Sequence, residues 1–339
     1  MNTQSATETK KQVGNGDLYF CPNGHQSESF SRKTLSDEKK KSIKKLYQLD
    51  KRWNWIIPFH FLLWIGSGII AIQTQGIWAD IICACIGGIG LGGLAVLVHE
   101  SSHSLFTHKR IDRWIGFLCG LPILVSANTY KLLHMNHHKF VRTEDDPDDI
   151  ENMPVSSHWL PIFYILILFV GAYLYIIHVP ISAWKISKKN RRSFLAETLA
   201  VWLFIAAGWV LLPSNVIIQM WLLPLIVGAQ IVSIRSISEH GLTSTGNEFV
   251  DTRTVLSNPA VSFLGCNVNY HLEHHLYPGI PWYNLPRLHF LLKDEFQKAG
   301  ASVYGSYTEF YLDLFKVFRD GIRNGTMLIP EHLREQLCI

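Results

Sequence analysis

The chain begins with a polar stretch and then alternates long apolar runs with short polar ones. Residues 1–50 contain no apolar run of the signal-peptide type, and residues 1 to about 35 show no helical or strand periodicity. The lysine-dense part from Ser36 to Arg52 predicts a helix at the level of lipid head groups. We therefore expect residues 1–50 to form a polar, partly disordered tail on the cytoplasmic side.

Five apolar runs follow, each close to the roughly 20 residues that an α-helix needs to cross a bilayer. They are Trp55–Gln73, Ala79–Val98, Trp159–Pro180, Leu195–Leu212 and Val216–Ser233. The second run is rich in glycine, which allows neighbouring helices to approach closely. This pattern predicts an all-α integral membrane protein that passes through the membrane several times.

The positions of the polar clusters limit how many of these runs cross. Histidine clusters follow the second run and the fifth run, and they can meet only if an even number of crossings separates them. The basic loop 185–192 also favours the cytoplasm. We therefore predict four transmembrane helices, with Trp159–Pro180 entering the membrane and turning back near Gly171. The shorter run Ile115–Ala127, interrupted by Pro122, is a second non-spanning segment.

The end of the chain has a different pattern. Leu285–Lys298 and Thr308–Phe318 have the periodicity of amphipathic helices, which predicts a cytoplasmic helical cap over the histidine clusters. The expected organisation is a tail at 1–50, a membrane-embedded domain with the histidines at 51–280, and the cap at 281–339.

Charge and cysteine content narrow the class of protein. The formal net charge is only +4, and the basic clusters lie beside apolar runs rather than forming a stripe, so no nucleic-acid partner is expected. The six cysteines are scattered and include no Cys-x-x-Cys pair. This distribution argues against a disulfide framework and fits an active site on a reducing, cytoplasmic side.

Three histidine clusters carry the candidate chemistry. The spacing His-x-x-His-His occurs twice, and a looser His-x-x-x-His pair precedes both. Residues three and four apart share one face of a helix, so each cluster can aim its imidazoles at one point. With one more candidate after the fifth run, the predicted metal ligands are His99, His103, His134, His137, His138, His240, His271, His274 and His275.

Nine imidazoles exceed what one metal ion uses, so the sequence predicts two ions. The ligand types alone leave iron, manganese, copper and zinc open. Glu100, Glu239 and Glu273 lie within or beside the clusters and either accept hydrogen bonds from ligand imidazoles or are solvated. The acidic run 143–149 is first a solvated loop, and a second interpretation gives one or two of its carboxylates the same orienting role.

The three motifs resemble those of the integral-membrane fatty acid desaturase superfamily, which includes desaturases, hydroxylases, acetylenases and carotenoid ketolases. They are His-Glu-Ser-Ser-His at 99–103, His-Met-Asn-His-His at 134–138 and His-Leu-Glu-His-His at 271–275. The context Asn-Tyr-His-Leu-Glu-His-His-Leu-Tyr-Pro-Gly-Ile-Pro also fits the third motif of the family. The resemblance covers roughly residues 50 to 295 and is greater to the bacterial acyl-lipid type than to animal acyl-CoA desaturases.

This resemblance implies a non-haem centre of two iron ions that uses dioxygen and two electrons to remove hydrogens from an unactivated C–H bond. It carries the ligand role over to the eight motif histidines, and to His240 by its position after the last span. Ser236 stands where animal acyl-CoA desaturases have a water-binding asparagine, so that detail does not carry over. The His-Pro-Gly-Gly motif of the family's fused cytochrome domain is absent, so a separate ferredoxin or cytochrome is the expected electron donor.

The predicted function is therefore an oxygen-dependent fatty acyl desaturase that forms a cis double bond in a lipid-bound or carrier-bound acyl chain. The alternative within the superfamily is a hydroxylase or ketolase acting on an acyl chain or a carotenoid. An alternative of another class is a non-enzymatic membrane protein that binds or transports metal. Transport would need ionisable residues within the spans, and Glu197 is the main one.

Overall fold

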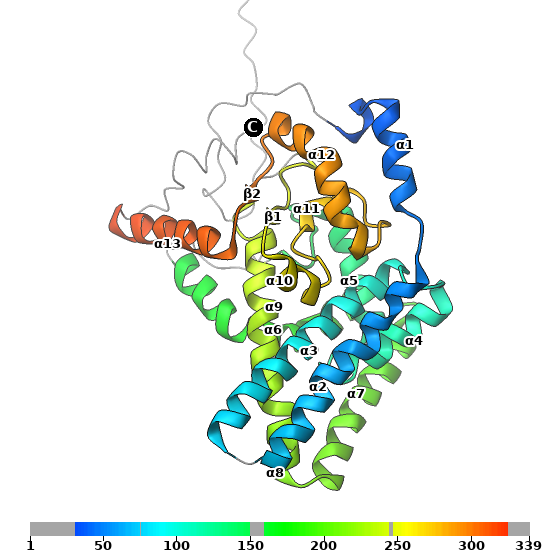
Figure 1. Cartoon of the computed structure of the whole chain (residues 1–339), viewed down its shortest axis with the longest axis vertical. Helices are drawn as coiled ribbons and strands as arrows, with labels where there is room; N and C mark the ends of the chain where they lie inside the picture. Colours follow the sequence, from blue (N-terminus) through cyan, green and yellow to red (C-terminus); the bar gives the residue numbers. More distant parts are fainter. Residues whose placement is uncertain (1–30, 75, 150–158, 244–246, 325–339) are drawn as a thin grey trace, which may run out of the picture.

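The computed structural model describes residues 31–74, 76–149, 159–243 and 247–324. Long helices form the lower half of the molecule in Figure 1, and shorter elements gather in the upper half. The lower half contains α2 (Ile56–Thr74), the longer part of α3 (Ile77–His103), α7 (Arg191–Leu211) and a continuous helix made of α8 (Ser214–Val216), a π-helical turn η6 (Ile217–Leu222) and α9 (Leu223–His240). The all-α fold class is thereby confirmed.

Glycines of α3 bring the neighbouring helices into close contact. The His60 imidazole of α2 lies against Gly93, at a distance that leaves no space for a Cβ atom. On the other side of α3, a Cβ at Gly88 would lie 2.5 Å from the Cβ of Val227 in α9. The glycine-rich pattern thus packs α3 between α2 and α9, where its second half is buried.

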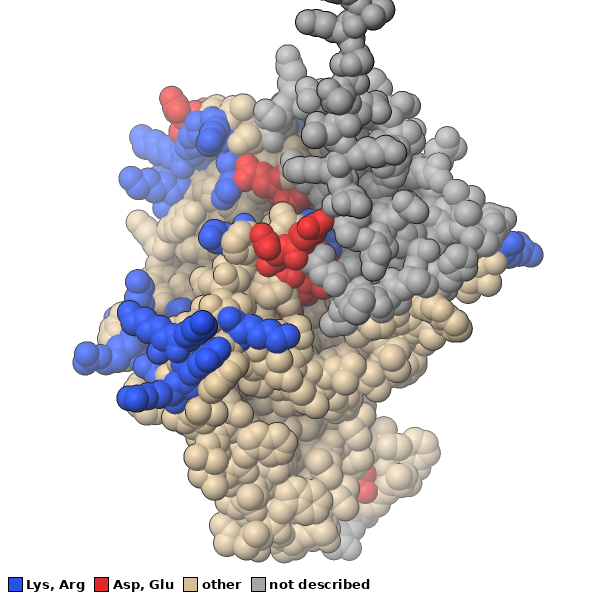
Figure 2. Space-filling view, turned by 180° about the vertical axis from the view of Figure 1, so that it is seen from behind, with Lys and Arg blue, Asp and Glu red and all other residues tan. Residues whose placement is uncertain are grey.

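Five helical stretches are long and apolar enough to cross a membrane, namely Lys51–Thr74, Ile77–His103, Pro161–Ile186, Arg191–Leu211 and Ser214–His240. Many of their large side chains are exposed, among them Leu62 on α2 and Trp202 and Val210 on α7. In Figure 2 the lower body is almost entirely free of charged side chains. Such an uninterrupted apolar surface is typical of a protein embedded in lipid.

The predicted turn near Gly171 is wrong, because α6 (Leu160–Ile186) continues through Gly171 as one helix. A helix in apolar surroundings satisfies its own backbone hydrogen bonds, and one glycine without a polar partner does not end it. Tyr164 in the first half of α6 packs against Phe318 of α13, and Tyr175 donates a 2.9 Å hydrogen bond to Asp148, which follows α5. Both parts of α6 therefore lie against elements of the half that contains the histidines. Whether α6 spans the membrane stays a prediction.

The upper half contains the remaining elements, and their order follows the chain. They are η2 (Arg32–Thr34), α1 (Asp37–Leu46), η3 (Lys51–Trp55), α4 (Lys109–Gly120), α5 (Ala127–Phe140), β1 (Thr254–Val255), α10 (Pro259–Leu264), α11 (His271–Leu276), η7 (Trp282–Asn284), α12 (Leu285–Ala299), β2 (Val303–Tyr304) and α13 (Tyr307–Asn324). The two short strands pair in parallel, with Thr254 opposite Val303. The two amphipathic helices expected after residue 281 are present as α12 and α13.

A small apolar core attaches α12 and α1 to the histidine-bearing helix α11. Leu272 and Leu276 of α11 pack against Leu288 and Leu292 of α12, and all four are buried. Ile43 of α1 joins this core, as expected for an amphipathic helix. The helix predicted within Ser36–Arg52 is thus confirmed as α1, whereas residues 1–30 of the expected disordered tail and residues 325–339 of the cap lie outside the described residues.

Candidate metal centre

The first two candidate ligands come from the end of α3, which extends beyond the apolar body as the sequence predicts. His99 and His103 are one turn apart, so both imidazoles lie on one face. The helix ends directly after them, because Ser104 adopts the left-handed conformation with φ 62°. Its N–H group bonds to the free carbonyl groups of Glu100 and Ser101. This end places the pair at the boundary between the two halves of the molecule.

Helix α5 supplies the second cluster, and Glu197 of α7 fixes where this helix begins. The Glu197 carboxylate accepts hydrogen bonds from the Ser126 hydroxyl at 2.7 Å and from the backbone N–H of Asn128 at 2.8 Å. A carboxylate at a helix N-terminus satisfies free N–H groups and is favoured by the helix dipole. Glu197 therefore has a structural partner, and it fixes the start of the helix that presents His134, His137 and His138.

The remaining candidates come from the last residue of α9 and from the short helix α11. His240 ends α9, and Arg253 holds the following backbone by donating to the carbonyl oxygens of Ser238 at 3.1 Å and Gly241 at 2.7 Å. Helix α11 begins at His271 and presents all three of its histidines within six residues. The structure thus brings together all nine histidines that the sequence singles out.

The nine imidazoles form two adjoining groups. Five of them offer nitrogens within 4.8 Å of one another, from His99, His103, His134, His138 and His274. A second set contains His137, His240 and His275, and His271 joins it because its Nε2 lies 2.8 Å from Nε2 of His240. The rings of His138 and His275 stack with centroids 4.2 Å apart and connect the two groups.

The distances between ring nitrogens fit metal ions. Nε2 of His134 lies 2.8 Å from that of His103 and 3.0 Å from that of His138. Two imidazole nitrogens bound at about 2.1 Å to one ion, at right angles, would be about 3 Å apart. Nε2 of His99 is buried and has no hydrogen-bond partner among the described residues, although its ring lies 4.3 Å from that of His274. This donor set is suited to holding a metal in each group.

Protonation also favours metal binding in the first group. Burial, and then the neighbouring histidines, hold the pKa of His134 and that of His274 well below the ordinary value of 6.5. Burial followed by the charges of His103 and His137 lowers the pKa of His138 to about 2. These imidazoles are therefore neutral at pH 7, which is the form that binds a metal ion.

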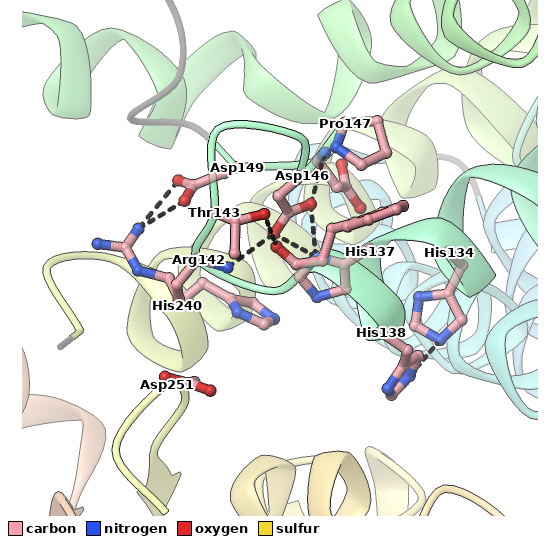
Figure 3. A network of polar contacts seen from close by, with 12 residues as sticks. His134, His137, His138, Arg142, Thr143, Asp146, Pro147, Asp149, His240 and Asp251 are labelled. Carbon is pink, nitrogen blue, oxygen red and sulfur yellow. Dashed lines mark hydrogen bonds and ion pairs between the residues drawn. The ribbon is translucent and has the colours of Figure 1, made fainter. Parts of the chain in front are cut away.

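His137 differs because a carboxylate faces its other nitrogen. Both carboxylate oxygens of Asp146 lie 2.9 Å from Nδ1 of His137, as the dashed lines in Figure 3 show. Burial opposes the charged form of His137, but the hydrogen bond and the negative charge of Asp146 outweigh it and raise the pKa of the imidazole. Asp146 belongs to the acidic run 143–149, and the structure confirms that one carboxylate of this run contacts a candidate ligand.

Arg142 holds the loop that carries Asp146. Its guanidinium pairs with Asp149 at 2.9 Å and donates to the carbonyl oxygen of Thr243 at 2.9 Å. The loop is thereby bound to the segment that follows His240, on the other side of the site (Figure 3). The contact between Asp146 and His137 therefore rests on links to two separate parts of the chain.

The three glutamates near the motifs have different surroundings. Glu100 is buried and accepts from His99 Nδ1 at 3.1 Å and from the backbone N–H of Trp282 at 3.3 Å. Glu239 lies 3.5 Å from His271 Nδ1. Glu273 instead binds Thr254 at 2.6 Å and His289, which is not a predicted ligand and received no role from the sequence. All three are buried, so the alternative of solvated carboxylates is wrong.

A cavity of about 330 Å³ leads to the histidines, and residues of α3, α5, α6 and α9 line it. Its apolar wall includes Leu91, Ala95, Ile123, Leu225 and Ala229, and its polar part includes His99, His134, His137, His271, Tyr130, Tyr175 and Arg235. Reasoning from the sequence gave no role to Tyr130, Tyr175 or Arg235. The position of Arg235 one and a half turns before His240 was the only available signal for it.

Comparisons with known proteins agree with this geometry. The family model described as "Fatty acid desaturase" matches residues 75–307, which is more than half of the chain. A sphingolipid delta(4)-desaturase DES1 of Drosophila melanogaster is 28% identical over 274 residues, which cover 78% of this chain and 82% of the relative.

Two further relatives widen the range of named activities. A human sphingolipid delta(4)-desaturase/C4-monooxygenase DES2 is 26% identical over 261 residues, covering 72% of this chain and 75% of the relative. An sn-1 oleoyl-lipid 12-desaturase of Arthrospira platensis is 22% identical over 264 residues, covering 70% and 74%. The matched regions of all three include most of each relative.

Proposed function

Because the chain belongs to the fatty acid desaturase family, we propose that it is an oxygen-dependent desaturase that forms a cis double bond in a fatty acyl chain at a centre of two non-haem iron ions. Membership of this family makes the chain a membrane-bound oxidoreductase whose substrates are a lipid and dioxygen. The observation that carries the proposal is the convergence of nine buried or half-buried imidazoles at one end of a largely apolar cavity.

The two groups of histidines would each hold one ion. His99, His103, His134, His138 and His274 would hold the first, and His137, His240, His271 and His275 the second. Asp146 and Glu100 would orient His137 and His99 by accepting the Nδ1 proton, so that Nε2 faces the ion. Imidazole suits several metals, and the choice of iron rests on the family and on the need for a redox-active ion.

The iron ions, when bound, supply the activation of dioxygen that the removal of hydrogen from an unactivated C–H bond requires. The balanced change is –CH2–CH2– + O2 + 2 e⁻ + 2 H⁺ → –CH=CH– + 2 H2O. The residues of the chain position the substrate for it. Leu91, Ala95 and Ile123 form apolar walls that exclude water and hold the acyl chain beside the imidazoles.

The active side of the membrane would be the cytoplasm. Exposed Lys109, Arg110 and Arg113 of α4 and Lys188 and Lys189 before α7 belong to neighbouring segments, since Arg113 donates to Ser193 at 3.2 Å. Figure 2 shows basic side chains gathered where the apolar body meets the upper half. Lysine and arginine at this level favour the cytoplasmic face. The protein would pass the membrane several times, and a separate ferredoxin or cytochrome would supply the electrons.

Hydroxylation is a second candidate, because the printed name of the human relative includes both a desaturase and a monooxygenase activity. Both outcomes begin with the removal of one hydrogen, and the position of the second hydrogen then decides between them. Metal transport has less support. Glu197, the main carboxylate within the predicted spans, is bound to Ser126 and Asn128 rather than facing a path.

The test compares the acyl profiles of aerobic cells that express the wild type, His274→Ala or His108→Ala, by mass spectrometry. His108 is exposed and belongs to neither histidine group, so it is the matched control. We expect a new unsaturated chain in the wild type and the control, and its loss in His274→Ala. A hydroxylated product would establish the second candidate, and an unchanged profile in cells supplied with a competent electron donor would contradict both.

A further inference from the structure

Arg235 of α9 is a buried cation that faces the cavity without a full set of partners. The side chain is 16% exposed, and it lines the cavity together with Ser236 and Glu239. The nearest carboxylate atom is Oε1 of Glu239, 3.6 Å from Nε, which is too long for a hydrogen bond. Neither Nε nor Nη1 has a hydrogen-bond partner among the described residues. A buried guanidinium that donates no such bonds is unfavourable unless a ligand accepts them.

The cavity changes character along α9. Leu225, Ala229 and Val232 line it first, Arg235 and Ser236 follow, and His240 ends the helix. Arg235 therefore lies between the apolar part and the histidines, five residues or about 7.5 Å along the axis before His240. Two tyrosines, Tyr130 and Tyr175, line the same part of the cavity. An acyl chain in the apolar part would bring a nearby polar group to this level.

We propose that the Arg235 guanidinium binds an acceptor oxygen of the substrate's polar group, so that the enzyme selects acyl lipids whose reacting carbons lie close to that group. Arginine offers only donors, and its planar fork suits carbonyl, carboxylate or phosphate oxygens. Glu239 balances the charge of Arg235 but leaves two donor nitrogens available. The reference to reacting carbons rests on the proposed function, whereas the binding of the oxygen does not.

A simpler role would make Arg235 a positioning residue only. In that case Arg235 would hold Glu239, and Glu239 would orient His271, whose Nδ1 lies 3.5 Å away. The two roles differ in their consequences. A positioning role changes metal content and affects every ligand alike, whereas recognition of an oxygen changes the preference between ligands with and without one.

The experiment measures binding to the purified full-length protein, without turnover, by competition against radiolabelled stearate. The competitors are stearate, N-stearoyl-sphinganine and octadecane, which present a carboxylate, an amide with hydroxyl groups, and no oxygen. We expect Arg235→Met to weaken the binding of at least one oxygen-bearing ligand by about 10- to 100-fold and to leave octadecane unchanged. Whichever oxygen-bearing ligand loses more affinity identifies the type of polar group.

Three further variants separate the roles. Arg235→Lys keeps the charge and should recover part of the preference. Arg113→Met removes an exposed arginine outside the cavity and should bind all three ligands as the wild type does. Glu239→Gln should keep the preference, because Arg235 remains. Equal losses for all three ligands in Arg235→Met, or an unchanged preference, would overturn the proposal. A retained preference in a protein that forms no oxidised product would reject desaturation alone.

Discussion

The carboxylates around the histidines decide which nitrogen of each ring faces a metal. Asp146 accepts from Nδ1 of His137 with both oxygens, and this contact leaves Nε2 directed towards His240 and His275. Glu100 does the same for His99 with one oxygen. A ring held in one tautomer and one orientation loses less entropy when it binds an ion. The affinity of the centre therefore depends on residues that would not touch the metal.

The first prediction concerns Asp146. Asp146→Asn removes the negative charge that faces His137, so we expect the affinity for iron to fall by about 10- to 100-fold. Asp145→Asn is the matched control, because Asp145 is exposed and lies next to Asp146 in the chain. The measurement is iron per protein by mass spectrometry after dialysis against graded concentrations of a chelator. Equal retention of iron by the two variants would show that Asp146 does not support the centre.

The second prediction concerns acid and the metal-free protein. His134, His138 and His274 have pKa values in the folded state below the unfolded value of 6.5. The unfolded chain therefore binds more protons below pH 6.5, so the stability contributed above this pH is lost as pH falls. Each such histidine lowers the free energy of unfolding by at most about 1.4 kcal/mol per pH unit. His137, whose pKa is raised, acts in the opposite direction but is only one group.

The thermal midpoint of the metal-free protein in detergent should therefore be lower at pH 5.5 than at pH 8. His138→Gln removes one of the groups with a lowered pKa and should make this dependence shallower. A midpoint that stays constant or rises on acidification would contradict the assignment of these imidazoles as neutral.

The convergence of the nine histidines could be predicted at the residue scale, because the spacing within one helix fixes which rings share a face. Their partners could not be predicted in the same way. Asp146 is one of five acidic residues in 143–149, and only the turn after α5 shows which one reaches His137. Arg235 was no more noticeable than other basic residues, because its exposure to the cavity depends on how α9 packs against α3 and α6.

At the scale of the elements, the contact between α2 and α3 depends on the absence of side chains. Gly93 receives the imidazole of His60, and Gly90 lies against the backbone of Trp64, one turn further along α2. Helices in a membrane gain little from burying apolar surface, so close van der Waals contact is what holds them together. The position of α3 in turn places His99 and His103.

The third prediction follows from this contact. Gly93→Ala would make a methyl group overlap the His60 ring, and overpacking of this kind destabilises a protein by about 1–3 kcal/mol. We expect a lower thermal midpoint, and partial recovery in the double variant with His60→Ala. Gly208→Ala in α7 is the matched control, since a Cβ there meets no atom within 4 Å. If Gly93→Ala unfolded at the same temperature as Gly208→Ala, the close contact would have no energetic role.

The helices themselves could largely be predicted from hydropathy, but the path of residues 159–180 could not. Gly171 and Pro180 both suggest a break, yet α6 continues through them. Its hydrophobic pattern is that of a spanning helix, and its direction is set by long-range contacts such as the hydrogen bond from Gln230 to the carbonyl oxygen of Phe169. No local feature of the sequence reports such a contact.

At the scale of the whole molecule, an apolar body of helices carries a polar half in which the histidines meet. The ends of α3 and α9 lie in the same cluster, because the rings of His137 and His240 are 4.7 Å apart and those of His103 and His134 are 4.9 Å apart. Helix α7 also starts at this level, since Glu197 binds the beginning of α5. The chain therefore returns to the same level between His103 and Glu197.

This geometry leads to the last prediction, which is that α6 does not cross the membrane although its composition permits it. In a variant without the six native cysteines, single cysteines would replace the exposed Lys44, Lys188 and Asn215. We expect an impermeant maleimide to label Lys44→Cys and Lys188→Cys from one side of sealed vesicles and Asn215→Cys from the other. A crossing by α6 would place Lys188 opposite Lys44 and would also move the end of α9 to the other side. Labelling of positions 44 and 188 from opposite sides would therefore reject both the four-span topology and the shared histidine cluster.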